Sequence, residues 1–460
     1  MAKALEALGR SDGLSGLGGF DEFCEGALAE HGCASVSVAV VDDERTVLAR
    51  AYGLADVAEG RAATPGTVYG LASATKPFTA LAVCLAADAG LLDLDAPLPG
   101  RHRFGAPTAR QLARHRGGFP AYYDFRYADA ADAGRPVDVA RYAEQVRAPG
   151  GAFEYSNLGY RELGLLLERV TGRPPAAYLR ERIAEPLGLD SFSLGPVSTG
   201  AGPVAARYTA DGRAYPVCRS SHPTAGEGWA TATDLARFAR HGAGLLAPGT
   251  AAARHDALPI PGRLGYGLGL VVQRTADGEV MASHGGGMGG VAAMLIDLPG
   301  RGLSAAVLAN STNKAARDAV VGRLAAALAP GFDTAAHLAP VQEPARPFAL
   351  APGRWAGAVD TAEGGVLLRL VVRADGRVEV GLADRPALTV PAVASADWDV
   401  RLTAPLQLPT ADARRNSPAL GLELRAEEGR LTGRAIAFKD GDRSGLLGPY
   451  LVHDCTLRPV

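Results

Sequence analysis

The sequence predicts an α+β protein in which an antiparallel sheet flanked by helices, with an inserted helical region, is followed by a small antiparallel β-barrel. Three observations predict it. Strand patterns occur near both ends of residues 1–339, and helical patterns lie between them. Residues 340–352 contain four prolines, which is typical of a linker. Residues 353–460 show several short alternating strands separated by turns, a pattern typical of a barrel or sandwich.

The elements of the first domain follow in order from hydrophobic periodicity. Apolar residues at helical spacing predict a helix over Phe20–His31, and β-rich runs predict strands over Ser35–Val41, Arg45–Gly53 and Thr67–Leu71. The next expected helices are Ala74–Gly90, Thr108–His115, Val137–Val146, Leu158–Thr171, Pro175–Ile183 and Thr233–His241. Strands are expected again at Tyr266–Arg274, Val280–Ser283, Val291–Leu298 and Leu303–Asn310, before a last helix at Lys314–Leu328.

In the second domain the expected strands are Val366–Val372, Arg377–Leu382, Trp398–Leu402, Leu420–Arg425, Arg430–Phe438 and Tyr450–Val452.

Composition excludes several classes of function. The chain has 460 residues, 47% of them hydrophobic and 21% charged, with a formal net charge of -2 and no basic block, so a nucleic-acid partner is not expected. No run of about 18 apolar residues occurs, and the first 20 residues lack the apolar segment of a secretory signal, so no membrane association and a cytoplasmic location are expected. Five scattered cysteines predict neither disulfides nor a zinc site, and no metal or cofactor is expected.

The first motif that could carry chemistry is Ser73-Ala74-Thr75-Lys76, where a strand gives way to a helix. A spacing of three residues puts both side chains on one helix face, so the Lys76 amine can reach the Ser73 hydroxyl. Serine is a weak nucleophile until a base takes its proton, and a buried lysine can lose its charge and serve as that base. The alternative is a helix-capping serine followed by a solvated lysine.

The second motif is Tyr155-Ser156-Asn157, which follows a glycine-rich loop and precedes a helix. A phenol beside a lysine can pass a proton to a leaving group, and an asparagine amide can hold a substrate carbonyl. The alternatives are that Tyr155 is only a packing residue and that Asn157 caps the helix.

The third motif is the run from Ser283 and His284 through six residues rich in glycine, Gly285 to Gly290. Glycines there allow a substrate backbone to lie against an edge strand. The run also fits the dinucleotide-binding pattern G-x-G-x-x-G. We reject that interpretation because a strand pattern, and not a helix, follows it. His284 is the one histidine of nine in such a setting, and the other eight are expected to be ordinary surface or core residues.

The three motifs in this order resemble the serine β-lactamase and penicillin-binding protein superfamily, in particular its class C-like branch of esterases, D-aminopeptidases and acyltransferases. The stretch Leu112–Pro120 is similar to the family segment LLTHTSGLP, and the stretches around Trp229, Asp234 and Tyr266 are similar to other family segments. The resemblance covers about Ser35–Leu328. The all-β domain resembles the lipocalin-like barrels attached to some D-aminopeptidases and penicillin-binding-protein-type thioesterases.

The resemblance implies a role for each motif residue. Ser73 would be the acylated nucleophile, Lys76 its base and Tyr155 the proton shuttle. His284 would be a fourth catalytic residue that assists Ser73. It stands where many relatives have the lysine of a KTG motif, a departure that disfavours true β-lactamase activity. Asn157, Gly285 and Gly286 would bind substrate, and the backbone N–H groups of Ser73 and Gly287 would form the oxyanion hole.

Two weaker features bear on substrate. Phe119, Tyr122, Tyr123, Phe125 and Tyr127 form an aromatic segment that either borders the cleft, with Tyr122 and Tyr123 binding substrate, or is structural. Arg443, in a turn of the barrel, either meets a substrate carboxylate or has no role.

The sequence therefore predicts an enzyme that forms an acyl-Ser73 intermediate from an amide, ester or thioester. A peptide-type substrate, free or presented on a carrier protein, and a thioesterase, cyclase or amide-forming activity fit the size and the barrel. A D-amino-acid aminopeptidase or amidase, or a class C-like carboxylesterase, is the first alternative. A non-catalytic sensor of β-lactams or peptides is the second.

Overall fold

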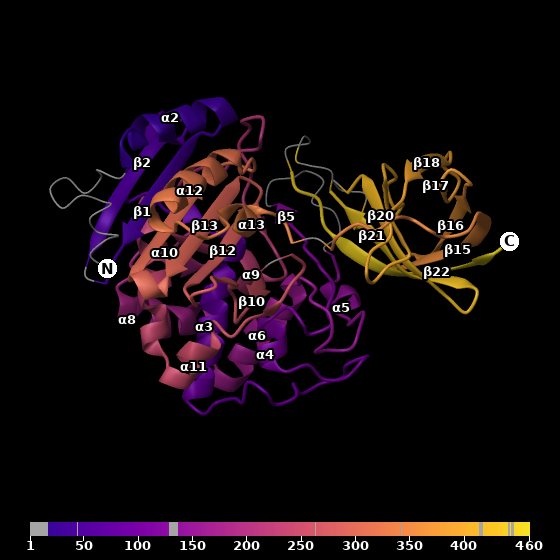
Figure 1. The fold of residues 1–460 in the computed structure, drawn as a ribbon, viewed down its shortest axis with the longest axis horizontal. Coiled ribbons are helices and arrows are strands. Elements are labelled where there is room, and N and C mark those ends of the chain that lie inside the picture. Colours follow the sequence, from indigo (N-terminus) through magenta and orange to yellow (C-terminus); the bar gives the residue numbers. More distant parts are fainter. Residues whose placement is uncertain are drawn as a thin grey trace. The chain divides into compact units, whose positions relative to one another are not determined.

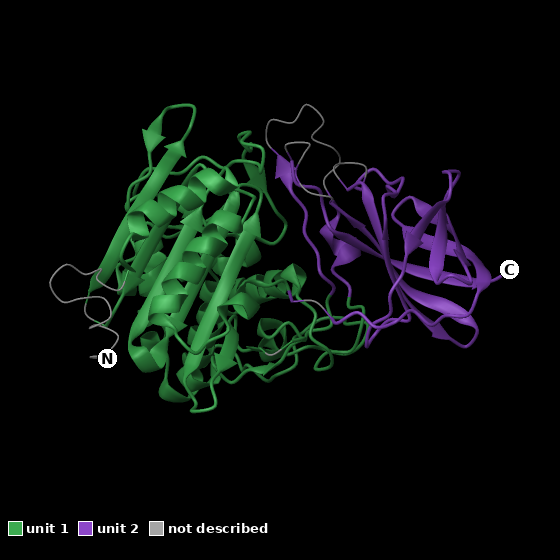
Figure 2. Ribbon diagram, turned by 45° about the horizontal axis from the view of Figure 1, so that its top comes forward, with its two compact units in different colours: residues 1–119, 145–340 green, residues 120–144, 341–460 purple. Residues whose placement is uncertain are grey.

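The computed structural model describes residues 17–43, 45–127, 137–262, 264–341, 343–413, 417–439, 442 and 446–460. The chain divides into two compact units (Figure 2). Unit 1 comprises Met1–Phe119 and Gln145–Pro340, and unit 2 comprises Pro120–Glu144 and Val341–Val460. Arg443 lies outside the described residues, so its expected role is a prediction without a structural account.

Unit 1 is built on a nine-stranded antiparallel sheet in the order β3-β2-β1-β14-β13-β12-β11-β10-β9 (Figure 1). The neighbours β1 and β14 lie far apart in the sequence, as expected from strand patterns at both ends of the domain. The strands are β1 (Ser35–Val41), β2 (Thr46–Asp56), β3 (Arg61–Ala62), β9 (Leu258–Pro259), β10 (Gly265–Tyr266), β11 (Val271–Arg274), β12 (Val280–Met288), β13 (Val291–Leu298) and β14 (Leu303–Ala309).

Every residue of β1 is buried, because helices cover both faces of this sheet. Alternate β1 residues, Val36, Val38 and Val40, share a core with α2 (Phe20–His31) and α12 (Ala315–Leu328). Helix α10 (Ala232–His241) packs on β1, β13 and β14 without joining that core, so it covers the opposite face. The remaining helices of unit 1 are α3 (Lys76–Asp88), α4 (Ala109–Ala113), α6 (Asn157–Thr171), α7 (Pro175–Leu179), α8 (Glu185–Leu187), α9 (Pro223–Gly226), α11 (Pro248–Ala253) and α13 (Thr334–Leu338).

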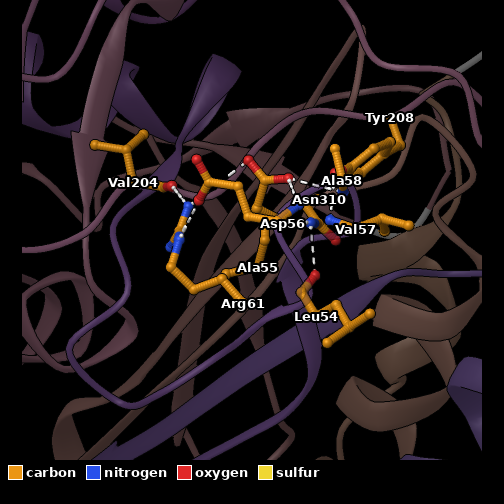
Figure 3. Close-up of polar contacts among 10 residues, drawn as sticks. Leu54, Ala55, Asp56, Val57, Ala58, Arg61, Val204, Tyr208 and Asn310 are labelled. Carbon is orange, nitrogen blue, oxygen red and sulfur yellow. Dashed lines mark hydrogen bonds and ion pairs between the residues drawn. The ribbon is translucent and has the colours of Figure 1, made fainter.

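A network of polar contacts fixes the turn between β2 and β3 (Figure 3). The backbone N–H of Val57 donates to the Tyr208 hydroxyl at 2.7 Å, and Arg61 donates to the carbonyl of Val204 at 2.8 Å. Asn310, at the end of β14, donates to the carbonyl of Leu54 at 3.3 Å and accepts the backbone N–H of Ser35 at 2.8 Å. Loops that lack a strand partner are thus bonded to the end of the sheet through side chains.

Unit 2 contains a near-closed antiparallel barrel of eight strands in the order β18-β17-β16-β15-β22-β21-β20-β19. Its interior is filled by alternating apolar side chains, as in β17, where Val378, Val380 and Leu382 are buried. The strands are β15 (Gly353–Thr361), β16 (Gly364–Val372), β17 (Arg377–Leu382), β18 (Leu388–Pro391), β19 (Val400–Ala404), β20 (Ala419–Glu427), β21 (Arg430–Phe438) and β22 (Leu451–Pro459).

Residues 120–144 belong to unit 2, whereas the sequence placed them in a continuous first domain of residues 1–339. We name residues 120–144 the excursion. Tyr123 exchanges backbone hydrogen bonds of 3.3 and 2.7 Å with Tyr450, and the Tyr127 hydroxyl accepts the N–H of Leu447 at 2.8 Å. Tyr142, in α5 (Val139–Tyr142), donates its hydroxyl to Asp412. Such long-range pairing leaves no local pattern from which sequence could place the segment.

Candidate active site

Ser73 lies in a short 3₁₀ turn, Ala72–Thr75, that leads directly into α3. The backbone of Ala72 has φ +45°, an uncommon left-handed conformation for a residue other than glycine. Two hydrogen bonds of the Thr75 hydroxyl stabilise the turn: it donates to the carbonyl of Ala72 at 2.6 Å and accepts the N–H of Gly228 at 2.9 Å. The Ser73 side chain is therefore half-buried on a rigid turn, whereas a longer strand over Thr67–Leu71 was expected and only β4 (Tyr69–Gly70) forms.

Lys76 is fully buried, and its Nζ atom lies 3.0 Å from Ser73 Oγ. The amine also donates to the carbonyl of Ala225 at 2.9 Å. Burial holds the pKa of Lys76 well below its usual range, and no carboxylate of the described residues offsets the loss of water. The alternative of a solvated lysine is thus wrong, and a neutral amine at this position can accept the Ser73 proton.

Tyr155 approaches the same hydroxyl from the segment before α6. Its phenol lies near the Ser73 hydroxyl, and the Lys76 Nζ atom lies 4.7 Å from the centre of its ring. Burial raises the pKa of Tyr155, partly offset by the nearby Ser73 hydroxyl, so the phenol keeps its proton near neutral pH. Three side chains from two parts of the sequence thus meet at one hydroxyl, and we call Ser73, Lys76 and Tyr155 the serine centre.

The glycine-rich run is itself part of strand β12, which continues to Met288 and not only to the expected Ser283. On the β11 side the pairing ends at Ser283, opposite Val271, whereas on the β13 side it continues to Met288. A Cβ atom on Gly286 would lie 2.0 Å from the carbonyl oxygen of Leu71, two residues before Ser73. The glycines therefore let β12 lie directly against the turn that carries Ser73.

Replacing Gly286 by alanine is expected to lower the free energy of unfolding by about 1–3 kcal/mol and to reduce activity, because backbone atoms that cannot move aside would meet the new methyl group. The control is Gly285→Ala, since a Cβ there would find its nearest atoms at 3.6 Å, an ordinary contact. Urea denaturation of both variants checks the loss of stability, and turnover is compared between Gly286→Ala and wild type. Equal losses of unfolding free energy in the two variants would contradict the close approach of β12 to Leu71.

His284 lies on β12 with both ring nitrogens hydrogen-bonded. Its Nε2 is 2.9 Å from the Tyr266 hydroxyl, and its Nδ1 is 2.8 Å from the carbonyl oxygen of Gly285. A carbonyl can only accept, so Nδ1 carries the proton and Nε2 accepts from Tyr266. Burial and the nearby Lys76 lower the pKa of His284 to about 3. Proton transfer by this imidazole would require one of these bonds to break.

The buried neutral state of His284 predicts a pH dependence of stability. In the unfolded chain a histidine has a pKa near 6.5, whereas in the folded chain the pKa of His284 is about 3. Unfolding therefore takes up a proton between these two pH values, and the free energy of unfolding decreases as the pH is lowered below about 6.5. Protonation of His284 on unfolding lowers the free energy of unfolding by at most about 2 kcal/mol between pH 7 and pH 5. Chemical denaturation of wild type and His284→Gln should show a wild-type advantage that shrinks toward pH 5. An advantage that stays constant would contradict the neutral state.

His115 is a residue of this region that the sequence left among the ordinary core histidines. It is 2% exposed, and its ring centre lies 4.2 Å from that of Tyr155, 4.8 Å from that of Tyr266 and 5.0 Å from that of Tyr160. The signal that could have found it is its place in the stretch Leu112–Pro120.

The other expected site residues lie on α6, on β12 and in the excursion. Asn157 is the first residue of α6, but the helix is capped by Ser156, whose hydroxyl accepts the N–H of Gly159 at 3.2 Å, so the capping alternative for Asn157 is wrong. Gly287 is exposed on β12. Tyr122 and Tyr123 belong to the excursion in unit 2, where Tyr122 is buried, and their binding of substrate remains a prediction.

The chain belongs to the beta-lactamase family, whose model matches residues 20–329, more than half of its length. This places it in the class of serine hydrolases with the β-lactamase and penicillin-binding-protein fold. A putative D-alanyl-D-alanine carboxypeptidase of Escherichia coli K12 is 32% identical over 197 residues. That match spans 37% of this chain and 45% of the relative, so the chain spans less than half the length of this curated relative.

Two solved structures extend the comparison. SurE is similar over 100% of both chains, with 26% sequence identity and a TM-score of 0.62. A D-amino acid amidase of Ochrobactrum anthropi SV3 is similar over 67% of this chain and 98% of its own, with 23% identity and a TM-score of 0.53. No helix in the described part of the chain is long and apolar enough to cross a membrane.

Proposed function

We propose that this chain transfers peptide-type acyl groups through an ester on Ser73, and that it passes them to an amine or to water. The observation that carries the proposal is the Lys76 amine, which is fully buried, lies 3.0 Å from Ser73 Oγ and has no carboxylate partner in the part of the chain that the structure describes. A structural serine and lysine pair would not need the lysine in its neutral form.

In the proposed reaction Lys76 takes the Ser73 proton while Oγ bonds to the carbonyl carbon of the substrate. The negative charge that develops on the carbonyl oxygen is stabilised by the backbone N–H groups of Ser73 and Gly287. The bond to the leaving group then breaks, and the thiol, amine or alcohol leaves with a proton from Tyr155. In the second half an amine or water attacks the ester and gives its proton to Tyr155, and Ser73 Oγ leaves with the proton that Lys76 had taken.

The preference for a peptide-type substrate rests on the likeness to the putative D-alanyl-D-alanine carboxypeptidase, because a carboxypeptidase acts on peptides. The likeness to SurE covers 100% of both chains and so includes the barrel, whereas the amidase match covers 67% of this chain. SurE has also been solved with D-Leu. We therefore propose a substrate whose acyl residue has the D configuration, with Asn157, Gly285 and Gly286 holding its backbone. A thioester donor and intramolecular attack by the peptide amine would make the chain a cyclase.

A turnover screen tests this proposal. Peptidyl thioesters that end in D-Leu are expected to react faster than the same peptides ending in L-Leu, and faster than D-amino acid amides and p-nitrophenyl esters. Mass spectrometry separates cyclic from hydrolysed product. Turnover of short esters alone would contradict the peptide preference and favour a carboxylesterase. Stable labelling of Ser73 without turnover would favour a sensor.

A further inference from the structure

The backbone on both sides of Tyr155 is bonded to one residue, His115. The N–H of Glu154 donates to the carbonyl oxygen of His115 at 2.9 Å, and the N–H of Ser156 donates to its Nδ1 atom at 3.0 Å. Tyr155 is the residue between these two amides. Its backbone is therefore held against a single histidine by one main-chain and one side-chain acceptor.

The ring of His115 also packs on the ring of Tyr155. The two ring centres lie 4.2 Å apart with an angle of 36° between the planes. Tyr160, Tyr266 and Phe153 surround the same imidazole at 5.0, 4.8 and 5.7 Å. Close-packed rings of this kind leave the imidazole one orientation, so its Nδ1 atom stays directed at the Ser156 amide.

The protonation state of His115 follows from these bonds. Because the Ser156 amide donates to Nδ1, that nitrogen carries no proton and the ring is the neutral Nε2–H form. Burial and the nearby Lys76 and His284 hold the pKa of His115 well below its usual range, which keeps the acceptor available. The Ser156 amide therefore requires the Nε2–H tautomer, although Nε2 is buried and has no hydrogen-bond partner among the described residues.

The backbone of His115 departs from ordinary geometry in a way that serves the same contacts. Its φ is +56°, and the residue lies just after α4 and is 2% exposed. Non-glycine residues in this region are uncommon, and they persist where surrounding structure requires them. Here the turn directs both the carbonyl oxygen and the ring of one residue at the segment before α6.

We infer that His115 is the positioning residue of the serine centre, which holds the Tyr155 phenol at Ser73 by binding the amides of Glu154 and Ser156 and packing on the Tyr155 ring. It touches neither substrate nor Ser73 in this role. The inference rests on the proposed acyl transfer at Ser73 and adds the residue that sets its proton-transfer geometry.

The test is a double-mutant cycle on the rate of Ser73 acylation, with a matched pair of substitutions. Asparagine and glycine both tolerate the positive φ of His115, but only asparagine keeps an acceptor near the Nδ1 position. His115→Gly is expected to slow acylation by about 100-fold with little change in KM, because a displaced phenol costs about this much. His115→Asn should stay within about fivefold of wild type, since its side-chain oxygen can accept the N–H of Ser156 in place of Nδ1. The main-chain carbonyl that accepts the N–H of Glu154 is present in both variants.

Coupling to Tyr155 separates positioning from general damage. In a Tyr155→Phe background, His115→Gly should slow acylation by less than about threefold, because the group it positions is already gone. Equal losses in both backgrounds, or His115→Asn no faster than His115→Gly, would overturn the inference. If His115→Gly does not fold, His115→Asn is measured in both the wild-type and the Tyr155→Phe backgrounds, and equal losses in the two would count against the clamp.

A measurement without substrate keeps this inference apart from the proposed function. Hydrogen exchange at the Ser156 amide should be slow in wild type and His115→Asn and at least about tenfold faster in His115→Gly, as expected when a buried hydrogen bond is lost. If wild type forms no Ser73 adduct, the proposed function fails and the exchange rates still decide the clamp. Unchanged exchange in His115→Gly would overturn it.

Discussion

Ser73→Ala is expected to abolish covalent labelling and to reduce turnover by roughly 10⁶-fold, as for loss of a nucleophile in other serine enzymes. Lys76 and Tyr155 both lie next to the Ser73 hydroxyl, so this oxygen is the one we expect to be activated. Intact-mass spectrometry after incubation with a peptidyl thioester or an activated ester measures the adduct. Thermal unfolding should change little, because the Ser73 side chain is only half-buried.

The control for this experiment is Ser193→Ala. Ser193 is a half-buried serine of unit 1 that accepts the N–H of Thr199 at 3.1 Å and lies in β6 (Ser193–Leu194). Its loss should leave labelling intact. An adduct that persists in Ser73→Ala, or disappears in Ser193→Ala, would place the nucleophile elsewhere.

Lys76→Met is expected to slow acylation by about 10³–10⁴-fold, because methionine fills the buried space but cannot take the Ser73 proton. KM should change much less, since the amine bonds to Ser73 and Ala225 and not to a group reserved for substrate. Single-turnover kinetics measure the acylation rate directly. Lys439→Met, which removes a lysine in unit 2, is the matched control.

The same variant tests whether the amine is neutral in the folded chain. The unfolded lysine is protonated up to about pH 10.4, whereas burial lowers the pKa of Lys76 in the folded chain. Between the two pKa values unfolding takes up a proton, so the wild type should gain stability relative to Lys76→Met as the pH rises. Activity should be lost as the pH falls through the lowered pKa. A constant stability difference across this range would contradict a neutral Lys76.

Most of the long elements were predictable because their hydrophobic pattern is local. Helix α2 and strands β1, β13, β17 and β21 have the predicted bounds. Strand β15 was missed because its sequence, GRWAGAVDT, is weakly alternating and has glycine at a point where a Cβ would lie 2.0 Å from the carbonyl oxygen of Thr456. Strand β18 was missed because it has only four residues, Leu388–Pro391. Strand β15 pairs with the distant β22 as well as with β16, whereas β18 pairs with β17, the strand just before it, so only β15 depends on a distant partner.

The serine centre was predictable because three short motifs occur in one order. The positions of Ser73, Lys76 and Tyr155 agree with that prediction, and their roles remain to be measured. His115 was not found, although it lies in the family-like stretch Leu112–Pro120, because its contacts with aromatic rings and its left-handed backbone are not visible in the sequence. The pairing of His284 with Tyr266 was equally invisible, because it joins two strands at a point that sequence does not specify.

The membership of the excursion in unit 2 has a consequence for how the chain folds and for how it can be cut. Tyr127 bonds to Leu447, 320 residues later, and Tyr142 to Asp412, 270 residues later. During synthesis these tyrosines leave the ribosome long before their partners exist, so unit 1 must close around an unpaired insertion and release it later to the barrel. A fragment that ends at residue 340 would keep the insertion and lose what it packs on. Because each unit is made of two separate stretches of the chain, neither can be cut out as one continuous segment.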